Sequence, residues 1–285
     1  MCRFTFYLGR PIRLSSLITD PSHSVIRQSF MAQEREEPLN GDGFGVAWYA
    51  PEYSDEPAVF KSVTPAWSNR NLRDLARVVA SHCILAHVRA ATQQLEVSET
   101  NCHPFTYGPY AFMHNGDVGG FRQIRRSLLA SLSAPIFESV HGTTDSEHLF
   151  ALFCDEVRTR DGNGDGCQPM VDSLRATVDR IRKLARDQGC DEPCYLNAVV
   201  TNGESAAAIR VTTGRPEHAD TLYINEGMKY VCEGGVCHML APDDGHGAII
   251  ISSEPLSEEP GWDPIPVNSL VRISKDRTVR VEPFE

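Results

Sequence analysis

The chain has 285 residues, of which 41% are hydrophobic and 23% charged, as in an ordinary globular protein with a sizeable core. Its formal net charge is −11, and no basic cluster with interleaved aromatic residues stands out, so nucleic acid is disfavoured as a partner. No apolar run approaches the length of a membrane span, and the N-terminus lacks the pattern of a secretory signal. These properties predict a cytoplasmic protein that does not enter a membrane.

The first predicted strand begins directly behind the initiator methionine, in "MCRFTFYLG". Residues 2–8 alternate between polar and apolar side chains, and Cys2 lies at the tip. Cysteine is small enough that removal of Met1 is expected, which leaves a thiol and a free α-amine on one residue. These groups titrate near ~8.5 and ~7.7–8.0 when unperturbed, so the amine can accept the thiol proton near neutral pH. The pattern is that of an N-terminal nucleophile, and a second residue without a role is the alternative.

The remaining elements follow a simple order along the chain. Further strands are predicted in the first half, at 43–49, 58–63, 83–90 and 110–115. Helical periodicity marks 71–80, 120–132, 143–157 and 170–189. Strands then return over 194–201, 206–212, 221–225, 229–232, 247–252, 269–274 and 278–284. This order predicts a layered α+β fold in which sheet packs on sheet and helices lie outside.

Two of the predicted helices carry clear end signals. The helix over 143–157 opens with Thr144 as N-cap and Glu147 three residues later, which is a capping box. The long amphipathic helix over 170–189 ends at Gly189. Since no internal repeat and no clean linker interrupts these elements, we expect one domain.

The late cysteines allow two interpretations. Cys190, Cys194, Cys232 and Cys237, with His238, have spacings at the loose edge of those found in zinc sites. The alternative is that they are free thiols in a reducing compartment, mostly buried as small apolar side chains.

The segment between the last two predicted helices resembles a calcium loop. It runs from Asp161 at the first position to Asp172 at the twelfth. Pro169 interrupts it, and the last ligand is the shorter aspartate rather than glutamate. A solvated, glycine-rich connector is therefore the favoured interpretation.

Polar residues of the first half collect at the ends of predicted strands. Asn115 and Gly116 can supply two donors to a developing oxyanion, and a tight Asn-Gly turn is the alternative. Arg89 ends an apolar strand, where its guanidinium can grip a carboxylate or make a structural ion pair. Asp145 lies in the first turn of a capped helix, where it can bind an ammonium group or only complement the helix dipole. Together with a terminal thiol, these groups describe a site for glutamine or another γ-glutamyl amide.

In motif order the chain resembles the class II glutamine amidotransferases, whose glutaminase domain belongs to the N-terminal nucleophile hydrolases. The resemblance rests on Cys2 followed by "NGDGFG", "HVRAAT", "NCHPF", "HNGD" and "TTDSE". It implies a four-layer αββα sandwich formed by one domain over 2–285. The motifs lie in 2–150, and the late strands over 190–285 are expected to complete the sandwich.

The resemblance also implies roles for individual residues. Cys2 is the implied nucleophile, with its α-amine as the base, and Asn115 with Gly116 forms the implied oxyanion hole. No metal and no organic cofactor is needed for this chemistry.

Substrate recognition is implied for residues on three of the motifs. Arg89, with Thr92 nearby, is expected to hold the substrate α-carboxylate, and Asp145 its α-ammonium group. Asp42 and His103 match motif positions close to the site, where we expect support rather than chemistry.

The chain also departs from the large synthases of the family. Gln93 and Gln94 follow Thr92 where histidine and glycine are usual, and no room is expected for a second domain that consumes ammonia. The opening is most similar to stand-alone γ-glutamyl hydrolases, such as the fungal-type glutathione-degradation amidotransferase subunit and the ergothioneine-pathway amidohydrolase. The resemblance therefore implies hydrolysis of glutamine or a γ-glutamyl thiol compound such as glutathione. The alternative is a non-catalytic or partner-dependent γ-glutamyl-binding subunit, with a peptidase or synthase as its partner.

Overall fold

The computed structural model describes residues 2–34, 39–90, 97–160, 166–227, 229–234, 236–240 and 247–285. The strands are β1 (Arg3–Arg13), β2 (Phe44–Trp48), β3 (Ala58–Ser62), β4 (Ala80–Val88), β5 (Phe105–Tyr107), β6 (Tyr110–Asp117), β7 (Tyr195–Thr201), β8 (Ala206–Thr212), β9 (Tyr223–Gly227), β10 (Lys229–Glu233), β11 (Val236–Leu240), β12 (Ala248–Ser252), β13 (Trp262–Pro264), β14 (Ser269–Ile273) and β15 (Val279–Pro283). The helices are α1 (Ser15–Ile18), α2 (Val25–Gln28), α3 (Arg70–Val78), α4 (Phe121–Ala130), α5 (Ala134–Glu138), α6 (Asp145–Arg158) and α7 (Cys167–Asp187), with short 3₁₀ helices η1 (Ala66–Ser68), η2 (Glu99–Asn101) and η3 (Pro216–His218). Among the described residues, none of the helices has the length and apolar character that crossing a membrane requires.

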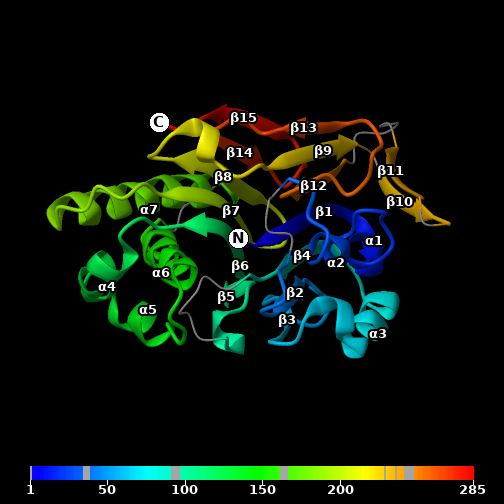
Figure 1. The fold of residues 1–285 in the computed structure, drawn as a ribbon, viewed down its shortest axis with the longest axis horizontal. Coiled ribbons are helices and arrows are strands. Elements are labelled where there is room, and N and C mark those ends of the chain that lie inside the picture. Colours follow the sequence, from blue (N-terminus) through cyan, green and yellow to red (C-terminus); the bar gives the residue numbers. More distant parts are fainter. Residues whose placement is uncertain are drawn as a thin grey trace.

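Two antiparallel sheets form the centre of the molecule (Figure 1). Sheet A has the strand order β13-β9-β12-β1-β4-β2-β3, and sheet B has the order β15-β14-β8-β7-β6-β5. Strands β10 and β11 form a separate hairpin at one end of the molecule (Figure 1). Because β12 pairs with β1 and β7 pairs with β6, strands from the second half of the chain lie beside strands from the first half in both sheets.

The alternation of side chains along β1 explains how the layers form. Phe4, Phe6 and Leu8 point into an apolar core that also contains Met113 of β6, so this core lies between the two sheets. The intervening Tyr7 belongs to a different core, on the other face of sheet A. The period of two therefore directs one face of β1 to sheet B and the other face to a layer of helices.

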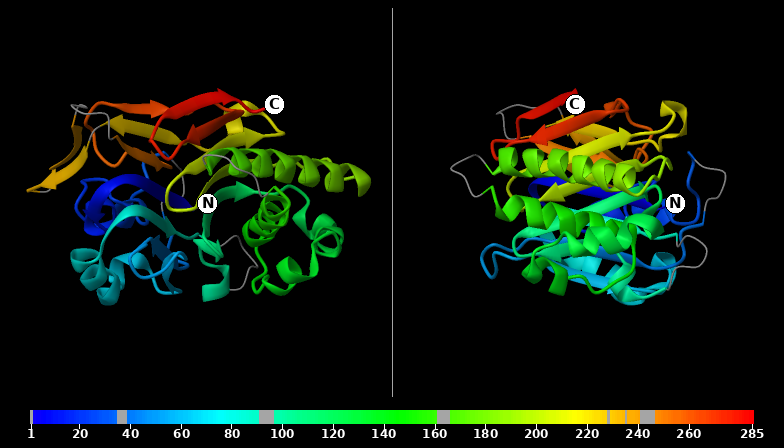
Figure 2. Two further views of the ribbon diagram at one scale, coloured as in Figure 1. Left: turned by 180° about the vertical axis from the view of Figure 1, so that it is seen from behind. Right: turned by 90° about the vertical axis from the view of Figure 1, so that its left-hand side faces the viewer.

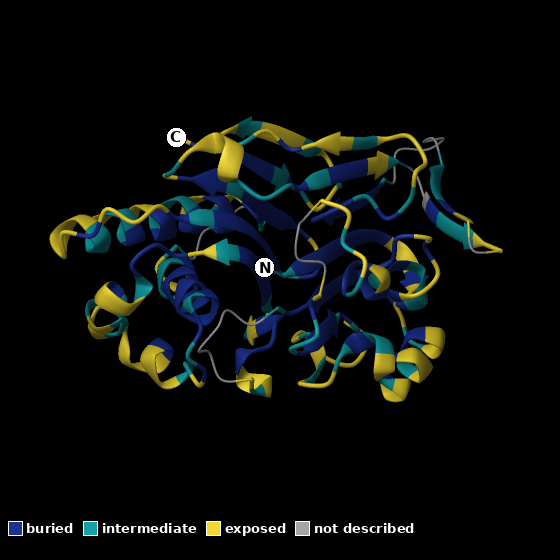
Figure 3. Cartoon of the chain, in the orientation of Figure 1, coloured by how far each residue is buried: buried dark blue, intermediate teal, exposed yellow. Residues whose placement is uncertain are grey.

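Each sheet is covered on its outer face by helices. Helices α1, α2 and α3 pack on sheet A through Leu17, Ile26 and Leu72. Helices α6 and α7 pack on sheet B, and α4 and α5 pack in turn against α6. Figure 2 shows α6 and α7 side by side over sheet B. Helix α6 is buried along most of its length, whereas the outer face of α3 is exposed (Figure 3). The molecule is thus the four-layer αββα sandwich that the family resemblance implies.

The structure confirms the predicted helix start at Thr144 and extends its role. The Thr144 hydroxyl accepts a hydrogen bond from the Glu147 backbone N–H at 3.2 Å, so Thr144 is the N-cap of α6. The Glu147 carboxylate accepts from the backbone N–H groups of His141 and Gly142, at 2.9 and 2.7 Å, rather than from that of Thr144. The carboxylate therefore links the preceding loop to the helix, whereas in a capping box it would accept from the N-cap backbone N–H.

The sequence patterns missed the shortest elements. Strands β5, β11 and β13 and helices α1, α2 and α5 have three to five residues each. A segment of that length does not complete two helical turns or a clear alternation, so its conformation is decided by its neighbours.

Helix α7 ends at Asp187, and Gly189 then adopts a φ of +63°. A Cβ at Gly189 would meet nothing within 4 Å, so the left-handed backbone alone opposes a side chain there. We expect Gly189→Ala to lower the free energy of unfolding by about 1 kcal/mol in urea titrations. The control is Gln188→Ala, because the neighbouring Gln188 is exposed and has a φ of −98°. An equal loss in both variants would contradict the assignment to backbone conformation.

Candidate active site

Cys2 lies where the start of β1 meets the end of β4. Arg3 pairs in register with Val88, so Cys2 faces the residues that follow Val88. The Cys2 thiol donates a weak hydrogen bond to the Ala90 carbonyl oxygen, with Sγ and O 3.8 Å apart. Burial raises the pKa of the Cys2 thiol, and the Arg89 charge acts in the opposite direction. Since the thiolate is the attacking species, this thiol needs a base close by.

Asn115 and Gly116 lie within the end of β6 and not in a tight turn, so the turn interpretation of the Asn-Gly pair is wrong. Gly116 pairs with Leu196 of β7 and has a φ of +141°. A Cβ on Gly116 would lie 1.8 Å from the Tyr195 carbonyl oxygen. The close approach of the two backbones therefore requires glycine at this position.

The Asn115 side chain is buried, and its Nδ2 donates a hydrogen bond to Asp220 Oδ2 at 3.4 Å. The Asn115 Oδ1 has no hydrogen-bond partner among the described residues. Asp220 is held by its backbone, because its carbonyl accepts from Asn197 Nδ2 at 3.2 Å and from Arg210 Nε at 2.9 Å. A carboxylate from the second half of the chain therefore lies beside the amide expected to serve as an oxyanion donor.

Asp145 begins α6 and is tied to the turn after β6. Its Oδ2 accepts from the Val118 backbone N–H at 2.9 Å, and its Oδ1 accepts from the Ser146 backbone N–H at 2.7 Å. The Ser146 hydroxyl lies 2.9 Å from Nδ1 of His114, which precedes the Asn-Gly pair in β6. The charge of Asp145 acts on the Cys2 thiol and raises its pKa, so the carboxylate lies near that thiol.

Arg89 follows β4 and is 3% exposed. Its backbone N–H donates to the Gly43 carbonyl at 2.8 Å, and its carbonyl accepts from the Asp42 backbone N–H at 3.0 Å. The "NGDGFG" and "HVRAAT" motifs thus lie side by side at the same edge as Cys2. Thr92 lies outside the described residues.

His103 belongs to a buried stack of rings. Its ring centroid is 4.1 Å from that of His87 and 4.6 Å from that of Phe105. Neither ring nitrogen of His103 has a hydrogen-bond partner among the described residues, and burial holds its pKa well below the usual range. The His103 carbonyl oxygen would lie 2.0 Å from a Cβ on Gly45 of β2. A neutral ring packed in this way is suited to support rather than to proton transfer.

Sequence analysis missed a buried charge network next to Cys2. Arg3 Nε and Glu254 Oε1 are 2.7 Å apart, and the two side chains are 1% and 0% exposed. The other Glu254 oxygen lies 2.6 Å from His23 Nε2 and accepts from the Gln33 backbone N–H at 2.9 Å. Arg3 Nη1 also donates to the Cys2 carbonyl oxygen at 2.9 Å. The network therefore holds the backbone of Cys2 itself.

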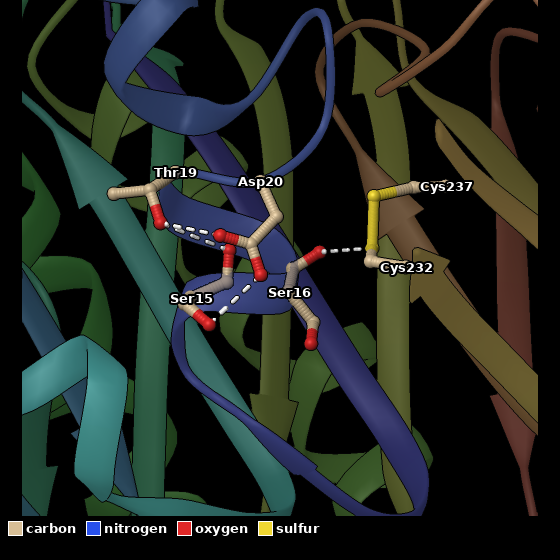
Figure 4. Close-up of a disulfide and its surroundings, with 6 residues drawn as sticks. All are labelled: Ser15, Ser16, Thr19, Asp20, Cys232 and Cys237. Carbon is tan, nitrogen blue, oxygen red and sulfur yellow. Dashed lines mark hydrogen bonds between the residues drawn. A yellow bond between two sulfur atoms is a disulfide. The ribbon is translucent and has the colours of Figure 1, made fainter. Parts of the chain in front are cut away.

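The late cysteines do not converge on one point. Cys232 and Cys237 form a disulfide across the β10–β11 hairpin, where they are paired residues (Figure 4). Cys190 and Cys194 are buried free thiols that precede β7. No group of three side chains suited to a metal ion occurs among the described residues. The zinc interpretation of these cysteines is therefore wrong, and the free-thiol alternative is wrong for the pair in the hairpin.

The possible calcium loop is only partly described. Residues 161–165, with Asp161, lie outside the described residues. Asp172 lies in α7, where its Oδ1 accepts a hydrogen bond from Gln168 Nε2 at 2.8 Å. The preference for a solvated connector stays a prediction.

A family model of class II glutamine amidotransferases matches residues 15–282. The chain belongs to this family. A Saccharomyces cerevisiae protein named "Probable glutamine amidotransferase DUG3" is 39% identical to this amidotransferase, over 100% of this chain and 84% of its own length. The "Gamma-glutamyl-hercynylcysteine sulfoxide hydrolase" of Mycolicibacterium smegmatis is 28% identical over 100% of both chains. The solved structure of a glutamine aminotransferase class-II domain protein from Silicibacter pomeroyi matches over 100% of both chains, with a TM-score of 0.69 and 26% identity. The family resemblance read from the motifs is confirmed.

The charge network of this amidotransferase gives it an acid-sensitive stability. Burial by itself raises the pKa of Glu254, but hydrogen bonds from His23 and Gln33 and the charge of Arg3 lower it from 4.5 to about 2. Because the folded-state pKa lies below the unfolded value, the stabilisation is present above pH 4.5 and is lost as the pH falls towards 2.

We expect Glu254→Gln to lower the free energy of unfolding at neutral pH by about 3 kcal/mol. The variant should also lose most of the decline in stability between pH 4.5 and pH 2, the interval bounded by the two Glu254 pKa values. Urea unfolding across that interval measures both effects. The exposed Glu259→Gln serves as the control, since it removes the same charge outside the network. If Glu254→Gln keeps the full acid-dependent decline, the network is not its source.

Proposed function

We propose that this amidotransferase hydrolyses a γ-glutamyl amide through a thioester on Cys2. The observation that carries the proposal is the position of the Cys2 thiol at the start of β1, within electrostatic reach of Arg89 and Asp145. A cation and an anion close together suit the α-amino-acid end of a substrate, because the cation matches its carboxylate and the anion matches its ammonium group. The family membership and the names of the relatives support the same reaction.

The proposed first step begins after Met1 has been removed. The freed α-amine accepts the proton of the Cys2 thiol, and Sγ attacks the γ-carbonyl carbon of the substrate. The negative charge that develops on the carbonyl oxygen is stabilised by the Asn115 amide and the Gly116 backbone N–H. The α-ammonium group of Cys2 then returns the proton to the leaving nitrogen, so the C–N bond breaks and a γ-glutamyl thioester remains.

In the second step, water replaces the leaving amine in the same site. The α-amine accepts a proton from this water, which attacks the thioester carbon, and the same two donors stabilise the second oxyanion. The thiol leaves with the proton, and free glutamate is released. The proposal needs no metal and no organic cofactor, because the residues of the chain supply the nucleophile, the base and the oxyanion donors.

Recognition is assigned to the glutamate head of the substrate. Arg89, with Thr92, is proposed to bind the α-carboxylate, and Asp145 the α-ammonium group. Asp42 and His103 are proposed to support this arrangement from the adjoining motifs. The leaving group lies outside these contacts, so glutamine and larger γ-glutamyl compounds such as glutathione are both candidate substrates.

The alternative is a subunit that binds the γ-glutamyl group but depends on a peptidase or synthase partner for turnover. Assays of the isolated chain with glutamine and with glutathione separate the two possibilities by the release of glutamate. Every position expected to be catalytic holds a competent residue, which favours an enzyme that is active alone.

We expect Cys2→Ala and Cys2→Ser to abolish glutamate release, because neither side chain supplies a thiolate at neutral pH. A glutamine-mimicking electrophile should label the wild-type chain once, with loss of the Met1 mass, and should label neither variant. Intact-mass spectrometry measures both events together. Cys102→Ala is the control, since it removes another buried thiol in the "NCHPF" motif. Full activity in Cys2→Ala, or a mature chain that keeps Met1, would refute the mechanism.

We expect Asn115→Ala to lower kcat on the order of 10²–10³-fold with a smaller change in KM, because the lost donor acts on the transition state. Steady-state kinetics with the better of the two substrates measure the split. Asn202→Ala is the control, because its Oδ1 accepts from the Glu204 and Ser205 backbone N–H groups in the turn after β7 and makes no bond to Asp220. A purely structural role for Asn115 would show as similar losses in both variants.

A further inference from the structure

A pocket lies in the outer helical layer that covers sheet A. Its volume is about 1010 Å³, and its walls come from the end of β1, from α1, α2, α3 and η1, and from the loops beside α1 and α2. The basic and aromatic side chains that line it are Arg13, Arg27, Arg73, Arg77, Phe30 and Trp67. We call it the arginine pocket.

We propose that the arginine pocket binds a small molecule that carries both phosphate groups and an aromatic ring, as nucleotides do. None of the residues assigned to the γ-glutamyl site lines this pocket, so the proposal is independent of the proposed function.

The charge of the pocket is the first argument. None of its four arginines forms an ion pair with a residue that the structure describes. Arg73 donates through Nη2 to the Trp67 carbonyl oxygen at 2.8 Å, which leaves the rest of its guanidinium donors available. In a chain with a formal net charge of −11, four guanidinium groups around one concavity are a local reversal of charge. A ligand with several negative charges offsets their mutual repulsion.

The single carboxylate in the lining does not neutralise these arginines. Asp20 Oδ2 accepts from the Ser15 hydroxyl and Asp20 Oδ1 from the Thr19 hydroxyl, each at 2.9 Å (Figure 4). The carboxylate is therefore used to brace the end of α1. Arg27 donates only a weak hydrogen bond, from Nη1 to Met31 Sδ at 3.8 Å. Most guanidinium donors of Arg13, Arg27 and Arg77 therefore remain for a ligand, and guanidinium forks match phosphate oxygens in pairs.

The apolar part of the lining is the second argument. The rings of Phe30 and Trp67 meet edge to face, with centroids 5.9 Å apart and planes at 78°. Both residues are only half-buried, and the buried Ile26 lies beside them in the lining. A flat aromatic group of a ligand can pack against this surface, with its phosphates among the arginines.

The size and shape of the pocket favour a small molecule over a protein segment. Its volume of about 1010 Å³ is at the upper end of the ~300–1,000 Å³ that is usual for small-molecule sites. The arginines and the aromatic rings line one concavity. An extended acidic segment of a partner protein would instead require basic and aromatic side chains along a groove.

The experiment is calorimetric titration of the full chain with ATP, ADP, inorganic pyrophosphate and adenosine. We expect saturable binding of ATP and ADP that weakens as salt is raised, with weaker binding of pyrophosphate and adenosine. The double variant Arg73→Gln, Arg77→Gln should weaken ATP binding by at least about tenfold. The matched control is Arg70→Gln, Arg126→Gln, which removes the same charge from exposed arginines outside the pocket.

Each other outcome overturns the proposal. The proposal is wrong if the wild-type chain fails to bind ATP and ADP, or if it binds pyrophosphate as tightly as ATP. It is also wrong if the chain binds an acidic octaglutamate peptide but neither nucleotide. Equal weakening in the two double variants would assign any binding to net charge and not to the pocket. Glutamate release serves as a separate readout, and we expect both double variants to keep it, because the pocket and the γ-glutamyl site share no residues.

Discussion

The buried ion pair between Arg3 and Glu254 is the constraint on which the position of Cys2, the proposed nucleophile, depends. Both side chains are almost fully removed from solvent, so loss of either one leaves an uncompensated charge in the interior. Arg3 is the first residue of β1 and also holds the carbonyl of Cys2. Strands β4 and β12 pair with β1 on its two sides. A chain end, which ordinarily frays, is thus held at one point of the fold.

The second half of the chain contributes to a site whose motifs lie in the first half. Asn197 and Arg210 hold the loop that places Asp220 beside Asn115, and Glu254 anchors the start of β1. These contacts exist because late strands lie beside early ones in both sheets. The surroundings of Cys2 and Asn115 therefore depend on residues that belong to none of the family motifs.

The two helical layers differ in whether they contribute residues to the proposed active site. The layer on sheet B supplies Asp145 from the first turn of α6, at the edge where the motif-bearing strands end. The layer on sheet A supplies no residue of the proposed γ-glutamyl site and instead encloses the arginine pocket. A binding event in that pocket would act on the outer face of sheet A, on the side opposite the core that joins the two sheets.

The sequence by itself determined the elements and the chemical types at the site. Periodicity and capping are local, so most of the longer strands, the long helices and the Thr144 cap were predictable within a few residues. The motif order identified the family, and Cys2, Arg89, Asn115 and Asp145 follow from it.

Sequence analysis placed the Asn-Gly pair in a possible turn and the late cysteines in a possible zinc site, because a local pattern does not show which strand lies opposite. Only the tertiary structure decided that Gly116 faces the Tyr195 carbonyl and that Arg3 meets Glu254, 251 positions away. The physical reason is that these contacts depend on strand register and burial, which arise when distant segments pack together.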